Sequence, residues 1–266
     1  MPGSISRLER FAVVGSTNDV VREWLAGGTP EICVAVADEQ TAGRGREGRT
    51  WMAPAGAALL LSLGFRPTWL RPEHLWRLAA ITSIAMAEAG EEAAALPAGS
   101  ILLKWPNDLV LESTDGVRKL AGVLGETDGL GTDDPRAVIG IGVNGDWAPG
   151  SFPAELVASM TSLRELAGRP IDQDALLDGF LERLDAAVSA LREGQFDAQG
   201  WSARQVTTDR DIDVIRPDGS RTTVRATGVD TDSGALLIGE RRVFVGEIEH
   251  VRLAMPAQDA APRIAV

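Results

Sequence analysis

Glycines at positions 43, 45 and 48 match the pattern G-x-G-x-x-G, and the residues after them restrict the fold more than any other feature of the sequence. In dinucleotide-binding βαβ units this pattern opens a helix whose N-terminus receives the pyrophosphate. Here the chain continues through Pro54 and Gly56, which cannot start a regular helix, into an apolar segment typical of a strand. The context therefore excludes a Rossmann site. A G-x-x-x-x-G-K-[ST] phosphate loop is also absent from the sequence.

The same segment, Thr41-Ala-Gly-Arg-Gly-Arg-Glu-Gly-Arg-Thr-Trp51, places three arginines on a glycine-rich loop in a chain whose formal net charge is -12. Glycine permits a close approach of the backbone to a ligand, and arginine offers paired planar donors to carboxylates or phosphates. These properties suit the enclosure of an anion by Arg44, Arg46 and Arg49. A solvated Arg/Gly loop has the same composition, so this segment alone leaves both interpretations open.

The overall composition limits the partners that we expect. Nucleic acids and anionic membranes are bound chiefly through excess Lys and Arg, so a net charge of -12 predicts no nucleic-acid and no membrane partner. Cys33 is the only cysteine, which excludes an internal disulfide and a cysteine-based metal site. The N-terminus lacks the basic-then-apolar pattern of a signal peptide, and we expect a cytoplasmic protein.

Hydrophobic patterning divides the chain into two parts. Up to about residue 204, apolar strands alternate with helical periodicity, whereas from 206 to 253 short β-branched segments are separated by turns. We predict a first domain at 1–204, a small all-β domain at 205–254 and a flexible tail at 255–266. Strands are expected at 11–14, 32–38, 59–65, 101–104, 109–111, 119–126 and 137–143. Helices are expected at 17–26, with N-cap chemistry from Ser16-Thr17-Asn18, and at 72–95, 154–167, 172–192 and 195–204.

Polar residues gather at the end of the strand expected at 101–104. Pro106 forces Trp105 into an extended conformation and ends the strand, and Asn107 and Asp108 favour a turn. Two polar side chains are thus presented at the end of a strand, directly after Lys104. A β-turn between two strands explains the Pro-Asn-Asp sequence equally well, but it does not explain the lysine that closes an apolar strand.

Two further strands carry residues that an ordinary core strand would not need. Lys119 begins a strand that is otherwise apolar up to Glu126, where an unpaired ammonium is costly unless it faces a cleft or a counter-charge. A lysine that reaches solvent at the strand edge is the alternative. In the segment that ends at Asn144, alternate glycines at 140 and 142 give up side-chain packing, which indicates close passage of a ligand or of another strand.

Together these segments resemble the biotin–protein ligases, and the resemblance runs from about residue 11 to residue 253. The motifs that carry it occur in the family's order: Ser16-Thr-Asn18, Gln40-Thr-Ala-Gly-Arg-Gly-Arg-Glu-Gly-Arg-Thr-Trp51, Lys104-Trp-Pro-Asn-Asp108, Lys119-Leu-Ala-Gly-Val-Leu-Gly-Glu126 and Gly140-Ile-Gly-Val-Asn144. The resemblance implies an α+β fold, with a mixed β-sheet catalytic domain of the class II synthetase and lipoate-ligase type followed by a small SH3-like β-barrel.

The resemblance also implies a reaction. Biotin and ATP, with Mg²⁺, would give biotinyl-5'-AMP and pyrophosphate, and a lysine of a biotin carboxyl carrier domain would then take the biotinyl group. Many family members carry an N-terminal helix-turn-helix domain and act as repressors; here the first motif begins at Ser16, so we expect a monofunctional ligase. A monomer and a homodimer are both compatible with the sequence.

Site residues are assigned from the motifs as implications of the resemblance. The catalytic residues implied are Lys119, which contacts the carboxylate and the α-phosphate, Arg46 of the closing loop, and Asp108, a candidate base for the acceptor amine. The mixed anhydride is already activated, so solvent is an alternative proton acceptor. The resemblance also implies that Lys104 and Asp108 organise the phosphates, Mg²⁺ or the acceptor amine, and it assigns no residue as a metal ligand. The substrate-binding residues implied are Ser16, Thr17, Asn18 and Gln40 at the biotin ring, Arg44, Gly45 and Arg46 over biotin and phosphate, Trp51 at the adenosine, Asn144 near the adenine, and Gly43, Arg49, Lys104, Asn107, Lys119 and Gly122.

Three other functions are distinguishable from this one. Lipoate ligases and octanoyltransferases typically carry an Arg-Arg-x-Ser-Gly-Gly-Gly loop, which this chain lacks. A DNA-binding regulator would need a basic domain. A biotin-binding module without activity would be expected to lose Lys119 or an arginine of the loop, and both are present.

Overall fold

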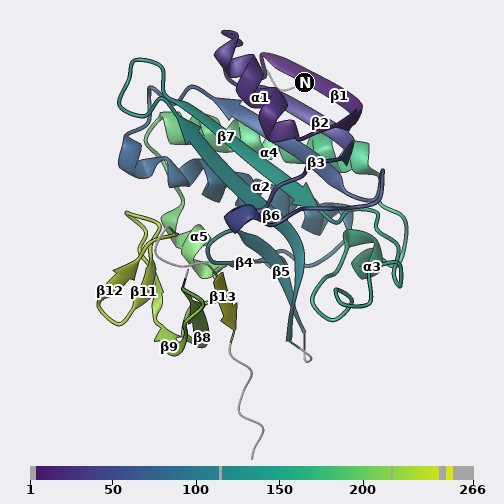
Figure 1. Cartoon of the computed structure of the whole chain (residues 1–266), viewed down its shortest axis with the longest axis vertical. Coiled ribbons are helices and arrows are strands. Elements are labelled where there is room, and N and C mark those ends of the chain that lie inside the picture. The colour runs from purple at the N-terminus through teal and green to yellow at the C-terminus, as the bar shows by residue number, and fades with distance from the viewer. Residues whose placement is uncertain (1–3, 114–115, 217, 246–249, 254–266) are drawn as a thin grey trace, which may run out of the picture.

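The centre of the protein is a mixed β-sheet (Figure 1). In the computed structural model, which describes residues 4–113, 116–216, 218–245 and 250–253, this sheet has seven strands in the order β1-β2-β3-β7-β6-β5-β4. Strands β1 and β2 are parallel, and every other neighbouring pair is antiparallel. The strands are β1 (Arg7–Val14), β2 (Cys33–Gln40), β3 (Leu59–Phe65), β4 (Leu102–Lys104), β5 (Asp108–Ser113), β6 (Gly116–Asp128) and β7 (Arg136–Val143).

Helices cover both faces of the sheet. Helix α1 (Thr17–Ala26) packs on one face, and α2 (Trp76–Ala93) and α4 (Gln173–Arg192) pack on the other (Figure 1). The apolar run in β2 reflects this arrangement, because Cys33 and Ala35 contact the α1 side while Val34 and Val36 join the larger core beneath α2 and α4. A strand buried on both faces shows a continuous apolar run instead of alternation.

The C-terminal residues form a separate set of small antiparallel sheets, as the turn pattern predicts. Helix α5 (Ala198–Ala203) leads into them, and Trp105 Nε1 donates to the carbonyl of Gly234 at 2.9 Å across the junction. Among the described residues they form two three-stranded sheets, β13-β8-β9 and β10-β11-β12. Their bounds are β8 (Arg210–Ile215), β9 (Arg221–Ala226), β10 (Gly228–Val229), β11 (Leu236–Ile238), β12 (Arg241–Val243) and β13 (His250–Leu253).

The helix predicted at 154–167 is wrong for most of its length. Only α3 (Leu163–Ala167) is helical, and the backbone just before it pairs with β6. Lys119 N donates to Ser159 O at 2.7 Å and Thr161 N donates to Lys119 O at 2.9 Å, so these groups are not available to a helix. Leu156, Ala158 and Met160 of this segment instead line a cavity beside the sheet.

Smaller differences concern the ends of elements. Pro72–His74 forms a separate 3₁₀ turn (η2) before α2, and the helix expected at 195–204 is limited to α5. Strand β6 extends beyond the predicted bounds at both ends. The tail predicted at 255–266 lies outside the described residues. Within the described ranges, no helix combines the length and the apolar character that crossing a bilayer requires.

A buried ion pair joins α2 to the segment that leads into the C-terminal sheets. Arg204 Nη1 lies 2.7 Å from Glu91 Oε1, and the Glu91 side chain is only 5% exposed. Burial acts to raise the pKa of Glu91, but hydrogen bonds from Arg204 and from the backbone N–H groups of Ile101 and Gly99 outweigh it and leave the pKa below its usual value. The pair therefore favours the folded state wherever Glu91 is ionised.

We predict that Glu91→Gln lowers the free energy of unfolding at pH 7 by about 3 kcal/mol, because it leaves the buried Arg204 with only the more distant carboxylate of Glu88, 3.9 Å away. The folded-state pKa of Glu91 lies below the unfolded value of about 4.3, so the native advantage is complete above that pH and is lost as the pH falls through the folded pKa. Urea unfolding at pH 7 and at pH 3 measures the difference. The control is Glu73→Gln, because Glu73 is exposed and pairs with Arg71 at the surface. A pH-independent gap for Glu91→Gln contradicts the assignment.

Candidate functional site

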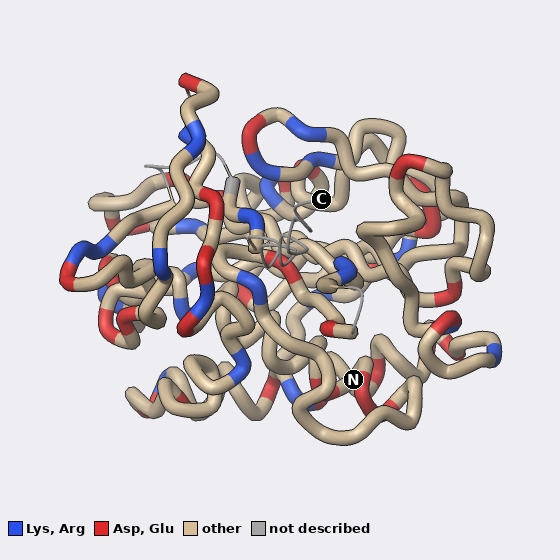
Figure 2. The backbone as a smooth tube through the Cα atoms, turned by 90° about the horizontal axis from the view of Figure 1, so that it is seen from below, with Lys and Arg blue, Asp and Glu red and all other residues tan. Residues whose placement is uncertain are grey.

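A cavity of about 1110 Å³ opens on the sheet face that carries α1. Its walls come from the glycine-rich loop, strands β5, β6 and β7, the segment before α3, and the C-terminal residues Arg210 and Arg252. Cationic and anionic residues are interspersed over the described part of the chain (Figure 2), but the cavity is locally cationic. Among the described residues that line it, seven are cationic and two are carboxylates: Arg44, Arg46, Arg49, Lys104, Lys119, Arg210 and Arg252 against Asp108 and Glu112.

The glycine-rich loop is a narrow hairpin-like turn. Trp51 N donates to Gly43 O at 2.9 Å and Gly45 N donates to Arg49 O at 2.7 Å, and the tip is a 3₁₀ turn, η1 (Arg46–Gly48). A Cβ atom at Gly43 would lie 2.4 Å from the carbonyl oxygen of Trp51, so only glycine fits there. The glycine at 43 therefore allows the two sides of the loop to pair.

The arginines of this loop have different surroundings. Arg44 forms a fork on Asp19, with Nη1–Oδ2 and Nη2–Oδ1 distances of 2.7 Å each, and this hydrogen bonding holds the pKa of Asp19 below its usual range. Arg46 is more buried, with 14% of its side chain exposed, and it donates to the carbonyl of Val245 at 3.2 Å. Burial lowers the pKa of Arg46, mainly because the charged form is desolvated. The sequence presents these arginines as equivalent, and the structure separates them.

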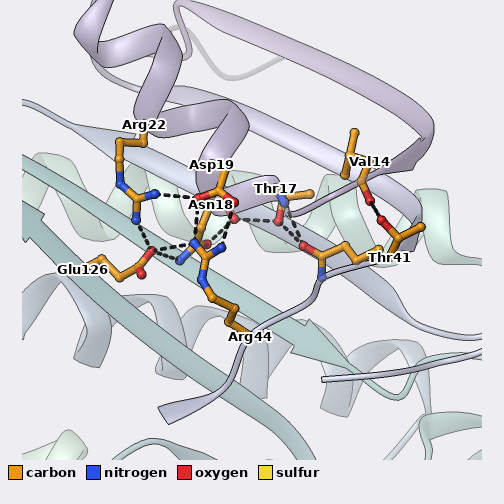
Figure 3. Close-up of polar contacts among 10 residues, drawn as sticks. Val14, Thr17, Asn18, Asp19, Arg22, Thr41, Arg44 and Glu126 are labelled. Atoms are coloured by element: carbon orange, nitrogen blue, oxygen red, sulfur yellow. Dashed lines mark hydrogen bonds and ion pairs between the residues drawn. The ribbon is translucent and has the colours of Figure 1, made fainter. Parts of the chain in front are cut away.

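A cluster of uncharged polar side chains lies where α1 begins (Figure 3). Ser16 occupies the predicted N-cap position, but its side chain makes no capping hydrogen bond. Thr17 donates from its backbone N and from Oγ1 to Gln40 Oε1, at 2.8 and 3.0 Å. Ser62 Oγ lies 2.7 Å from Thr17 Oγ1 and 2.5 Å from Asn18 Oδ1.

The hydroxyl protons in this cluster are too few for its contacts. Thr17 and Ser62 supply one hydroxyl proton each, but three contacts depend on them: Thr17 with Gln40, Ser62 with Thr17, and Ser62 with Asn18. All three residues Ser16, Thr17 and Asn18 are at most 5% exposed. A ligand that brings N–H donors would complete the network.

The alternate glycines of β7 make room for two side chains of the same chain, and not for a neighbouring strand. A Cβ atom at Gly140 would lie 2.2 Å from Asn18 Oδ1, and one at Gly142 would lie 2.6 Å from Trp51 Cε2. Trp51 also lies over Gly122 of β6. The glycines thus let Asn18 and Trp51 lie flat on the sheet surface and form the floor of the cavity.

Two lysines share one carboxylate beside Trp51. Lys119 Nζ lies 2.6 Å from Asp108 Oδ1, and Lys104 Nζ lies 3.5 Å from Asp108 Oδ2. Lys119 Nζ is also 5.2 Å from the centre of the Trp51 ring. Burial lowers the pKa of Lys104, although the charge of Asp108 opposes the shift. Lys104 at the end of β4 and Lys119 near the start of β6 therefore place their ammonium groups in the same part of the cavity.

A β-bulge aims Lys119 into the cavity. Val110 pairs with Lys119 but Leu109 pairs with Ala121, so Leu120 has no partner on β5. In a regular strand, residues 119 and 122 would point to opposite faces; the extra residue puts them on the same one. Lys119 Nζ accordingly lies 3.0 Å from the position of a Cβ atom at Gly122. Sequence periodicity does not reveal this shift.

The cavity lining includes the site residues named from the sequence except Gly43 and Asn144. Asn144 is fully buried and donates to Thr161 O at 2.9 Å, so it supports the wall before α3. Its Oδ1 and Trp51 Nε1 are buried polar atoms without a hydrogen-bond partner in the described part of the chain. Asn107 reaches the cavity, but its Nδ2 donates to Val123 O at 2.9 Å.

Several residues that line the cavity, or that support its lining, were not predicted from the sequence. Ser62 is the one polar side chain in an otherwise apolar strand, which is a signal that the sequence offered. Arg210 and Arg252 reach the cavity only because the C-terminal sheets dock beside β5, and nothing in their local sequence indicates it. Asp19 and Glu126, which hold Arg44, were also missed.

We predict that Gly140→Ala destabilises the fold by about 2 kcal/mol, because the new methyl group overlaps Asn18 and must displace it. Gly125→Ala on β6 is the matched control, since its Cβ atom would meet only Ile139 Cδ1 at 3.4 Å. Urea unfolding of both variants measures the effect. Equal stabilities for the two variants would show that Asn18 is not held against β7.

Comparison with known proteins finds a matching family and several similar proteins. The model of the biotin/lipoate A/B protein ligase family matches residues 11–144. A biotin–[acetyl-CoA-carboxylase] ligase of Mycobacterium tuberculosis is 32% identical over 253 residues, covering 92% of this chain and 90% of the relative. A ligase of the same name from Paracoccus denitrificans is 34% identical over 227 residues, covering 80% of this chain and 87% of the relative.

A solved structure has the same fold. The biotin protein ligase of Aquifex aeolicus in complex with biotin and ATP superimposes with a TM-score of 0.75 at 25% sequence identity. The superposition covers 93% of this chain and 99% of the other. The similarity therefore extends over the sheet, the helices and the C-terminal module together.

Proposed function

The chain belongs to the biotin/lipoate A/B protein ligase family, and from this premise we propose that it activates biotin with ATP as biotinyl-5'-AMP and transfers the biotinyl group to a lysine of a biotin carboxyl carrier domain. One observation supports this function most directly. A single cavity joins an uncharged polar cluster to a group of cations, and Trp51 lies between them. Along β7, Gly140 lies under Asn18, and Gly142, two residues further, lies under Trp51 beside Lys119.

The polar cluster suits the ring system of biotin. The ureido group of biotin is uncharged and offers one carbonyl acceptor and two N–H donors. Thr17, Asn18, Gln40 and Ser62 need an additional donor to complete their hydrogen bonds. Buried polar groups left without partners are costly, so a ligand that supplies N–H groups gains affinity and specificity here.

The cations suit the activation step. The biotin carboxylate attacks the α-phosphorus of ATP, a carboxylate O–P bond forms, the bond to the β-phosphate oxygen breaks, and pyrophosphate leaves. Two anions must approach each other, and fixed positive charge lowers the barrier most where charge develops in the transition state. In our proposal Lys119 contacts the carboxylate and the α-phosphate, and Arg46 closes the loop over them.

Mg²⁺ would be brought to this site by the nucleotide. In the described ranges, no three His, Cys, Asp or Glu side chains gather in a group that could hold a metal ion. Mg²⁺ on nucleotides is bound mainly by phosphate oxygens. The carboxylates in the cavity lining are already paired, Asp108 with two lysines and Glu112 with Arg210, so the phosphates would supply most of the ligands. The ion would neutralise charge on the departing pyrophosphate.

The transfer step needs an acceptor for the proton of the attacking amine. Asp108 is the candidate from the sequence, but both of its carboxylate oxygens face lysines in the structure. We therefore favour the alternative in which solvent takes the proton, since the mixed anhydride is already activated. Asp108 would then position Lys104 and Lys119 for the phosphates.

The remaining parts of the chain have supporting roles in this proposal. Residues 1–204 form the catalytic domain, and 205–254 form an SH3-like module that contributes Arg210 and Arg252 to the cavity. The two small antiparallel sheets support this interpretation of the module. We propose a cytoplasmic location because ATP is the co-substrate. A monomer and a homodimer are both compatible with this function.

The function is tested by incubating the protein with biotin, MgATP and a carrier domain. Release of pyrophosphate and a mass increase of one biotinyl group on the carrier are expected. Preferential use of lipoate or octanoate would assign the protein to the other branch of the family.

Lys119→Ala is expected to reduce adenylate formation by about 1000-fold without unfolding the protein, because it removes the cation that in our proposal contacts the carboxylate and the α-phosphate. Pyrophosphate release with biotin and ATP alone measures this step. Arg118→Ala is the control, since Arg118 pairs with Glu165 outside the cavity. Equal turnover of the two variants refutes the role of Lys119.

Arg46→Gly is expected to release the adenylate before transfer, because the variant loses both a cation and the contact with the Val245 carbonyl that holds the loop tip. Free biotinyl-5'-AMP in solution and biotin on bystander amines are the measured quantities. If the variant forms adenylate but none escapes, Arg46 does not retain the intermediate.

A further inference from the structure

Four charged side chains form a closed ring at the side of the cavity (Figure 3). Positive and negative charges alternate around it. Arg22 lies 2.5 Å from Asp19 and 2.7 Å from Glu126, and Arg44 lies 2.7 Å from Asp19 and 3.5 Å from Glu126. Each carboxylate thus bridges both arginines.

The ring joins three segments that are distant in the sequence. Asp19 and Arg22 lie one turn apart on α1, Glu126 is on β6, and Arg44 belongs to the glycine-rich loop. Arg44 also pairs with Thr50 across the loop. The base of the loop is therefore tied to a helix and to the sheet at once, through side chains with half or less of their surface exposed.

Charge in the ring balances. Two carboxylates compensate two guanidinium groups, so Arg44 adds little net field to the cavity. A planar fork on a carboxylate is the strongest geometry available to arginine, and Arg44 uses it on Asp19. Arg46, in contrast, lies at the tip of the loop and donates to the Val245 carbonyl.

The ring also reaches a residue of the polar cluster. Asn18 Nδ2 donates to Glu126 Oε2 at 2.7 Å, which fixes the amide so that its Oδ1 faces Ser62. Glu126 therefore orients Asn18 and contacts Arg44 with the same carboxylate oxygen. The position of the loop base and the orientation of the polar cluster depend on one another.

We propose that Asp19 and Glu126 are positioning residues that set the biotin end of the cavity, by holding Arg44 and Asn18 in place before biotin enters. This inference rests on the proposed function. It assigns the three arginines of the loop to different tasks: Arg44 anchors the loop to the protein, and Arg46 and Arg49 supply its charge toward the phosphates. If Arg44 instead left the ring to bind phosphate, Asp19 would only compete with the nucleotide.

Arg44 held in the ring and Arg44 released to bind phosphate predict different kinetics for Asp19→Asn. Anchoring predicts that KM for biotin rises about tenfold, the scale of coupling within an ion-pair network, while kcat and KM for ATP remain unchanged. Glu126→Gln is expected to act in the same direction. Asp174→Asn removes a carboxylate paired with Arg10, remote from the cavity, and is the matched control. Thermal melting of each variant confirms that it is folded.

The biotin affinities of a double and a single variant distinguish anchoring of Arg44 from a general loss of stability. The double variant Asp19→Asn/Arg44→Ala should bind biotin no more weakly than Arg44→Ala alone, because the contribution of Asp19 to biotin binding acts through the Asp19–Arg44 pair, which Arg44→Ala already removes. Calorimetric titration with biotin in the absence of ATP measures the affinity of each variant for biotin.

The outcomes distinguish the inference from the function on which it rests. If native protein ligates biotin but Asp19→Asn leaves KM for biotin unchanged, or lowers KM for ATP, the anchoring role is overturned and the ligase function stands. Additive losses in the double variant overturn it as well. If native protein neither binds nor ligates biotin, the proposed function fails and the inference fails with it.

Discussion

Repulsion between cations within one cavity is the constraint on which the rest of the structure depends. Two unit charges 4 Å apart interact by about 4 kcal/mol at the effective dielectric constant of a protein surface. The protein offsets this repulsion locally: Arg44 is held by Asp19, and Lys104 and Lys119 flank Asp108. The cavity lining still carries more cations than carboxylates, so its net charge is positive where an anionic ligand would enter. An overall negative charge is compatible with anion binding because the field at the site is set by the nearest groups.

The floor of the cavity depends on missing side chains. Asn18 and Trp51 can lie against β7 only because residues 140 and 142 have no Cβ atom. The bulge at Leu120 then brings Lys119 beside the Trp51 ring. Recognition of an uncharged ring and stabilisation of charge are thus placed within a few residues along adjacent strands, which suits a substrate that carries a ring at one end and a carboxylate at the other.

Much of the fold could be predicted from patterning. Strand β3 was located at its observed bounds, and β2 and β7 nearly so, because buried strands keep their apolar runs in any context. The helix expected at 154–167 failed because its backbone pairs with β6, a partner about 40 residues away that helical periodicity cannot indicate. Ser62 could have been recognised as a polar residue inside an apolar strand; Arg210 and Arg252 could not, since only docking of the C-terminal sheets brings them to the cavity.

The sequence by itself determined the chemistry of the site: which side chains can bind anions, where glycine interrupts the strands, and which family the motifs resemble. Only the tertiary structure decided how those side chains are used. It placed Arg44 on Asp19 and Glu126, directed Lys119 into the cavity through a bulge, and buried Asn144 in the wall instead of the lining. The physical reason is that charge pairing and strand register are set by contacts between distant segments, whereas residue type and local pattern carry only what neighbours along the chain can determine.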